Sequence, residues 1–195
     1  MTGKALAVTL VAAIAAAGFV KHEDRLREQN RLAVVASELA GRPVGVRCPS
    51  FLRGLVDVHG DAGRVRFNAN ERPAGYTDLS PDTCQALRRL PHTDFSCLQH
   101  HACGYAAFDA AWAAHTLAHE AFHLRGYEDE AVAECYAMQD TAFVAERLGV
   151  KPPIAYALQQ WVWDKGYRNE PDDYRSPECR PGGALDLTPQ TPSWP

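Results

Sequence analysis

Two histidines and a glutamate stand at helical spacing in the segment AHEAFHLR (118–125). On a helix, His119 and His123 differ by about 40° in direction and about 6 Å in height, so both imidazoles can reach one metal ion. Glu120 is rotated by about 100° from His119, which places its carboxylate beside such an ion. This pattern, HExxH, is typical of two zinc ligands and one general base.

A second acidic segment follows directly. Gly126 ends the first helix, and EDEAVAECYAMQDTAFVAERLG (128–149) predicts another helix. If the two helices form an antiparallel hairpin, the two histidines lie opposite Glu130 and Glu134, which share one helical face. Two buried carboxylates side by side repel each other without a cation, so this face predicts a metal site. The same face continues into residues of an inward-facing type: Ala137, Met138 and Thr141.

These residues resemble the zinc metallopeptidases of the HExxH class, and more narrowly the gluzincins, in which a glutamate on a following helix completes the site. EAVAE (130–134) is similar to the gluzincin pattern of a glutamate, two residues, an alanine and an acidic residue. The resemblance covers about 25 of the 195 residues. It implies Zn²⁺ held by His119, His123 and Glu130. It also implies a supporting carboxylate at Glu134 and hydrolysis of peptide bonds with Glu120 as general base.

The third ligand has two alternatives. No histidine follows His123, so a downstream ligand must be a carboxylate. HEAFHLRGYED (119–129) also resembles the start of the metzincin signature, whose glycine lets the chain turn and deliver a ligand at the position of Asp129. Metzincins then need a methionine turn, and Met138 lies in a predicted helix without turn residues. Glu134 is the remaining alternative, and all three fit the ligand chemistry of zinc.

The surrounding chain predicts an α+β fold, with a small N-terminal sheet followed by a helical bundle that carries the HExxH helix and its acidic partner. Gly and Pro punctuate four β-branched runs in residues 41–79, which predict three or four strands: VGVRC, LVDVHG, RVRFNA and AGYTDL. An edge strand of this sheet would align an extended peptide by β-addition. Ser80 is the expected N-cap of the next helix. Three further helices are expected at 105–125, 128–149 and 152–167.

The two ends of the chain differ in composition from the residues between them. ALAVTLVAAIAAAGFV (5–20) is uncharged and fits either a cleaved signal peptide or a membrane anchor. We therefore divide the chain into a signal peptide or anchor (1–20), a helical stem (21–40), a zinc metallopeptidase-like domain (41–180) and a Pro-rich flexible tail (181–195).

Six cysteines behind an export-like segment predict disulfides and an extracytoplasmic location, either membrane-anchored or secreted. They allow 15 pairings, among which the spacing does not choose. In CLQHHAC (97–103) a loop held by a disulfide is the favoured interpretation, and a separate metal site is the alternative. His115, one turn before His119, is expected to be a packing residue, with a supporting role at the metal site as its alternative.

The function that these patterns favour is zinc-dependent hydrolysis of a peptide or protein substrate. Nucleic acid is not an expected partner, because the net charge is −4 and no long basic run is present. The alternative function is a non-catalytic extracytoplasmic zinc-binding or interaction domain. A residue that stabilises the transition state is sought by type alone, among Tyr76, Tyr127 and Tyr136.

Overall fold

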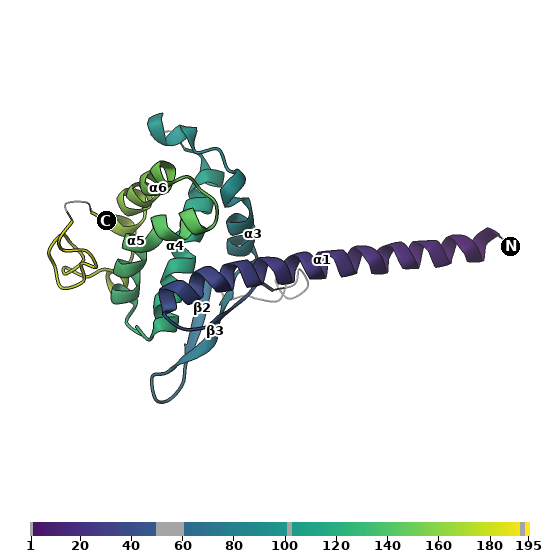
Figure 1. The fold of residues 1–195 in the computed structure, drawn as a ribbon, viewed down its shortest axis with the longest axis horizontal. Coiled ribbons are helices and arrows are strands. Elements are labelled where there is room, and N and C mark those ends of the chain that lie inside the picture. Colours follow the sequence, from purple (N-terminus) through teal and green to yellow (C-terminus); the bar gives the residue numbers. More distant parts are fainter. Residues whose placement is uncertain (1, 50–60, 101–102, 192–193) are drawn as a thin grey trace.

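The computed structural model describes residues 2–49, 61–100, 103–191 and 194–195, with side chains from residue 19 onward except at 99 and 100. It confirms the α+β fold, since a small sheet precedes a helical bundle (Figure 1). The predicted strand LVDVHG (55–60) lies outside the described residues, as do most side chains of the proposed signal or anchor segment (5–20).

Three strands are described, and they pair in the order β1-β3-β2. The strands are β1 (Gly45–Arg47), β2 (Gly63–Phe67) and β3 (Pro73–Leu79). β1 runs parallel to β3, whereas β2 runs antiparallel to it. In the described part of the chain β2 is thus an edge strand, and its register places Val65 opposite Thr77 of the central strand.

Helix α4 (Tyr105–Arg125) is the centre of the domain. It contacts β2, β3 and four helices: α1 (Thr2–Ala40), α3 (Pro81–Arg89), α5 (Glu130–Arg147) and α6 (Pro152–Lys165). Its alanines allow these neighbours to approach closely, and a helix enclosed on all sides buries every face. Five polar residues of its C-terminal half are therefore buried as well, and each needs a partner inside the protein: His115, Thr116, His119, Glu120 and His123.

The helix ends follow the expected capping residues with two corrections. Ser80 accepts a hydrogen bond from the Thr83 amide at the start of α3, and Gly126 ends α4 with a φ of 118°. α5 begins at Glu130, later than predicted, because Asp129 caps it by accepting from the Val132 amide. α6 ends earlier than predicted, at Lys165, before the 3₁₀ turn η3 (Tyr167–Asn169). The predicted loop 91–104 contains two short 3₁₀ helices, η1 (Leu90–His92) and η2 (Ser96–His100).

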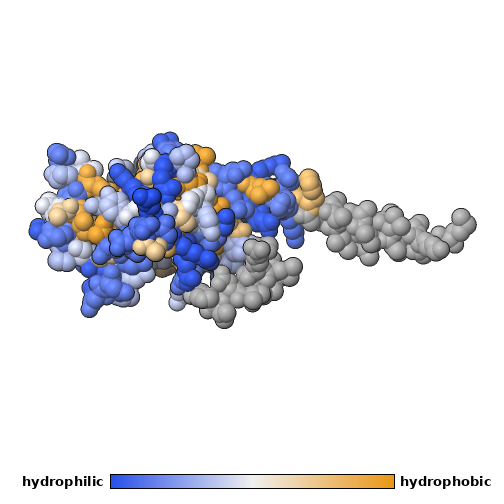
Figure 2. All heavy atoms as spheres, turned by 90° about the horizontal axis from the view of Figure 1, so that it is seen from below, coloured by the Kyte–Doolittle hydropathy of each residue, from blue (hydrophilic) through white to orange (hydrophobic). Residues whose placement is uncertain are grey.

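Helix α1 joins the domain by its C-terminal part, where Leu32, Val35, Ala36 and Leu39 are buried. Its N-terminal end lies far from the bundle (Figure 1). Hydrophilic side chains cover most of the described surface on the face seen in Figure 2, with small apolar patches between them. Among the residues searched, no helix is long and apolar enough to cross a membrane.

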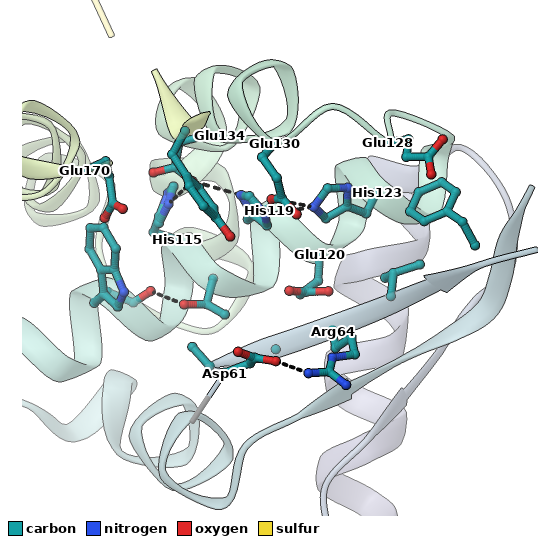
Figure 3. Close-up of a pocket in the computed structure, with 17 residues that line it drawn as sticks. Asp61, Arg64, His115, His119, Glu120, His123, Glu128, Glu130, Glu134 and Glu170 are labelled. Atoms are coloured by element: carbon teal, nitrogen blue, oxygen red, sulfur yellow. Dashed lines mark hydrogen bonds and ion pairs between the residues drawn. The ribbon is translucent and has the colours of Figure 1, made fainter. Parts of the chain in front are cut away.

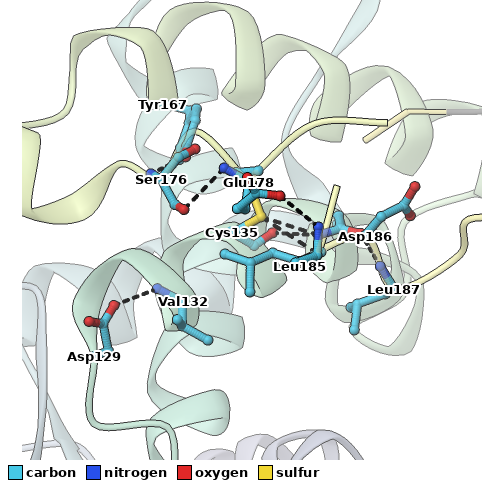
Figure 4. Close-up of a disulfide and its surroundings, with 12 residues drawn as sticks. Asp129, Val132, Cys135, Tyr167, Ser176, Glu178, Leu185, Asp186 and Leu187 are labelled. Atoms are coloured by element: carbon cyan, nitrogen blue, oxygen red, sulfur yellow. Dashed lines mark hydrogen bonds between the residues drawn. A yellow bond between two sulfur atoms is a disulfide. The ribbon is translucent and has the colours of Figure 1, made fainter. Parts of the chain in front are cut away.

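All six cysteines are paired, as predicted, in the disulfides Cys48–Cys84, Cys97–Cys103 and Cys135–Cys179. They indicate an oxidising, extracytoplasmic environment. The second bridge closes the loop before α4, which bears out the disulfide interpretation of CLQHHAC. The third bridge ties the C-terminal segment to α5 (Figure 4). In the segment predicted as a flexible tail, Trp194 packs on Trp163 of α6, with ring centroids 5.6 Å apart.

Candidate metal centre

Helices α4 and α5 bring three donor atoms together. The Nε2 atoms of His119 and His123 lie 2.9 Å apart. The Oε2 atom of Glu130 lies 3.0 Å from the first and 3.1 Å from the second. Figure 3 shows the two imidazoles and this carboxylate converging from the two helices. The turn at Gly126 makes this possible, because it ends α4 directly after His123 and lets α5 return alongside it.

The other ring nitrogen of each histidine is already engaged. Nδ1 of His123 donates to the Tyr127 carbonyl oxygen at 2.6 Å, since a carbonyl can only accept. Nδ1 of His119 donates to Oε2 of Glu134 at 2.8 Å. When both rings are neutral, each Nε2 therefore has a lone pair for a metal ion, in the tautomer that second hydrogen bonds commonly fix at metal sites.

Glu134 lies behind the three donors and holds two histidines with one oxygen. Besides His119, its Oε2 atom accepts from Nε2 of His115 at 3.0 Å. His115, His119 and Glu134 form a second group whose donor atoms lie within 4.8 Å of one another. Both histidine nitrogens donate to the carboxylate, so this group fits a role in supporting the three donors. His115 therefore has a polar role in addition to packing.

Burial and mutual contact shift the pKa values of the carboxylates and histidines in this group. Burial acts to raise the pKa of Glu130 and of Glu134, but hydrogen bonds and charge from the neighbouring histidines outweigh it and lower each pKa to about 2. Burial acts to lower the pKa of His119, but its bonds to the two carboxylates outweigh this and raise it to about 10. The raised pKa of His119 favours its protonated form, whose positive charge offsets those of the two carboxylates.

The donor set fits a small divalent cation. Tetrahedral zinc with bonds of ~2.0–2.1 Å needs donors about 3.4 Å apart. The three donors here lie 2.9–3.1 Å apart, so a shift of a few tenths of an ångström in each side chain would open them to that spacing. The structure thus contains a buried His/Glu group that could hold a metal ion.

Asp129 does not belong to this donor group. Its side chain caps α5 by accepting from the Val132 amide at 3.0 Å. Of the three carboxylates considered for the third ligand, Glu130 is the one that contacts Nε2 of both histidines. Glu134 contacts His119 at its other ring nitrogen, Nδ1, and Asp129 contacts the backbone of its own helix.

Glu120 points to the other side of the histidine pair, toward the sheet (Figure 3). It is 4% exposed, and Oε2 accepts a hydrogen bond from the Thr77 hydroxyl of β3 at 3.0 Å. Burial raises the pKa of its carboxyl, against an opposing effect of His119 and His123. A raised pKa suits a group that takes up and releases a proton near neutral pH.

Gly63 of β2 explains how the sheet can approach this carboxylate so closely. A Cβ atom at position 63 would lie 2.7 Å from both Cγ and Oε1 of Glu120. We expect Gly63→Ala to displace Glu120 and to lower any activity that depends on it by about 10²-fold, the cost of a 1 Å misplacement. Metal binding should persist, because none of the three donors is touched.

The matched control is Gly75→Ala in β3, where an added Cβ meets nothing within 4 Å. Turnover measured beside metal content checks the comparison. Equal activity of Gly63→Ala and Gly75→Ala would contradict the close packing of Gly63 on Glu120.

The raised pKa of His119 predicts that metal binding depends on pH. Its pKa in the metal-free protein is raised to about 10, so the metal must expel a proton from it at neutral pH. We expect affinity for zinc to rise with pH by up to about tenfold per pH unit between about pH 6 and pH 8. Competition titrations with a chromogenic chelator measure this slope, and an affinity that stays level would contradict it.

A cavity of about 500 Å³ opens beside the donors. Its lining includes Tyr174 from the 3₁₀ helix η4 (Asp172–Tyr174), whose ring stacks on His119 with centroids 6.0 Å apart. Sequence reasoning missed Tyr174. Cys179, five residues further on, was the available signal, because its disulfide ties this segment to α5 next to Glu134.

The three tyrosines proposed from the sequence do not line this cavity. Tyr76 lies under the Arg47 guanidinium, whose carbon is 3.3 Å from the ring centroid. Tyr127 and Tyr136 pack against each other and against Phe122. Among the tyrosines of the described chain, Tyr174 is the one that faces the donors through this cavity.

No family model matches this chain, and neither a curated protein nor a solved structure matches it.

Proposed function

We propose that the protein is a zinc-dependent peptidase. The observation that carries the proposal is the convergence of both Nε2 atoms and the Glu130 carboxylate within 2.9–3.1 Å, with each Nδ1 already committed to another acceptor. Two imidazoles and one carboxylate are a ligand set of catalytic zinc sites, which keep a fourth position open.

Glu120 favours a catalytic site over a structural one. A buried carboxylate that does not bind the metal costs free energy. A structural zinc site has no use for that carboxylate, whereas a hydrolytic site needs a base beside the reacting water. The Thr77 hydroxyl holds this carboxylate at 3.0 Å and Gly63 leaves the space that it occupies.

The chemistry is hydrolysis of an amide. A zinc ion bound by the three donors would polarise the scissile carbonyl and lower the pKa of a water in its open position. Glu120 accepts a proton from the attacking water as its oxygen bonds to the carbonyl carbon. The same carboxyl then gives that proton to the nitrogen that leaves when the C–N bond breaks. Tyr174 lines the same cavity, and its hydroxyl would stabilise charge that develops on the carbonyl oxygen.

An extended peptide is the substrate that the sheet favours. β2 borders the cavity through residues that include Gly63, Val65 and Phe67. On the side away from β3, no other described strand pairs with it. A peptide laid along this edge would pair its backbone with β2 and bring its carbonyls past the donors.

The test is cleavage of a mixed peptide library by protein stripped with a chelator and then reloaded with zinc, read by mass spectrometry. We expect the stripped protein to be inactive and one equivalent of zinc to restore cleavage. One bound zinc without cleavage of any peptide would favour the non-catalytic zinc-binding domain instead. Cleavage that survives complete metal removal would reject the zinc mechanism.

A further inference from the structure

One end of the cavity carries negative charge that the metal centre does not use. Figure 3 shows Glu170 at the end beside His115, and Glu128 at the opposite end. Within the described chain, the Glu170 carboxylate has no hydrogen bond or ion pair. Burial and the charge of Glu134 raise the pKa of Glu170, against an opposing effect of His115 and His119.

A second, independent observation comes from Glu134. Its side chain is 3% exposed and lines the same cavity. Oε2 accepts from two histidines, but Oε1 is buried without any hydrogen-bond partner among the described residues. An unsatisfied buried carboxylate oxygen is costly, by roughly 1–3 kcal/mol or more for a charged group. A ligand that donates a hydrogen bond there would recover that cost.

The wall between these two carboxylates suits a long cationic side chain. Trp112 lines the cavity and packs on His115, with ring centroids 4.8 Å apart. Thr116, one turn further along α4, also lines it and donates its hydroxyl to the Trp112 carbonyl. An alkyl stem can lie along the indole while its charged head reaches the carboxylates.

We propose that this end of the cavity binds an ammonium or guanidinium group of the peptide, with the head between Glu170 and Oε1 of Glu134 and the stem along Trp112. The assignment rests on the proposed peptidase function and names its substrate class: peptides with a lysine or arginine close to the cleaved bond. The position is close to that bond because Glu134 hydrogen-bonds His119 directly.

The test measures binding without turnover. Zinc-loaded Glu120→Gln protein is titrated calorimetrically with two N-acetylated peptides that differ only in lysine against norleucine. We expect the lysine peptide to bind about tenfold more tightly, the value of one charge-assisted hydrogen bond. Adding Glu170→Gln should remove that preference and leave the norleucine peptide unaffected. The matched control, Asp173→Asn, removes the same charge from an exposed residue outside the cavity and should keep the preference.

Three other outcomes are informative. Equal affinity for both peptides would overturn the proposal. Two bound metal ions per chain, with the second lost in Glu134→Gln, would overturn it as well, because Oε1 would then be a metal ligand. If the lysine peptide binds as expected but the wild-type protein cleaves no peptide, the proposed peptidase function is rejected. The proposed cation-binding site in the cavity then still stands.

Discussion

We expect Glu120→Gln to lower the rate of the proposed peptide hydrolysis by about 10²–10⁴-fold, the usual contribution of general acid–base catalysis. Glutamine keeps the shape of the side chain and can still accept from the Thr77 hydroxyl, which lies 3.0 Å from Oε2 in the native protein. What it loses is the ability to take a proton. Metal content and thermal stability should therefore stay at the wild-type level while turnover falls.

The matched control is Glu128→Gln, which removes the same charge from the end of the cavity that lies away from Glu170. We expect this variant to keep most of its activity. Steady-state kinetics on both variants, with zinc measured in the same samples, make the comparison. Full activity in zinc-loaded Glu120→Gln would reject Glu120 as the base.

His123→Ala has the second large expected effect, this time on the metal itself. Removing one of three protein ligands should weaken zinc binding by on the order of 10²–10³-fold, because a total of ~10–16 kcal/mol is shared among three or four ligands. The rise in melting temperature that zinc gives the wild type should shrink accordingly, since a ligand stabilises the folded state only as far as it is bound. Peptide cleavage should be lost with the zinc.

His92→Ala serves as the control, because His92 is exposed and lies outside the cavity. Metal analysis after dialysis and melting curves with and without zinc separate the two variants. If His123→Ala retained one tightly bound zinc, the ion would have to lie elsewhere in the protein.

The grouping of His119, His123 and Glu130 was predictable because its parts are local in the sequence. The spacing of His119 and His123 on one helix, the turn at Gly126 and the return of the second helix set which residues face each other. The hairpin predicted from these features places Glu130 and Glu134 opposite the histidines, and the structure has both carboxylates there. The helix ends were also foreseeable, because caps depend on single residues such as Ser80.

The parts that escaped prediction come from distant segments. Thr77 is 43 residues from Glu120, and strand pairing at that separation leaves no mark on the local pattern. The close approach of Gly63 depends on the same packing of sheet on helix. Tyr174 and Glu170 reach the cavity through a segment held by the Cys135–Cys179 disulfide. That bridge was one of 15 possible pairing schemes, which spacing alone could not rank.

The most direct test of the central claim is anomalous diffraction at the zinc edge from crystals of the zinc-loaded protein. We predict one ion per chain, bonded at about 2.0–2.2 Å to Nε2 of His119, Nε2 of His123 and a carboxylate oxygen of Glu130, with one position left to water. An ion held instead by His115 and Glu134, or one closed off by a fourth protein ligand, would contradict it.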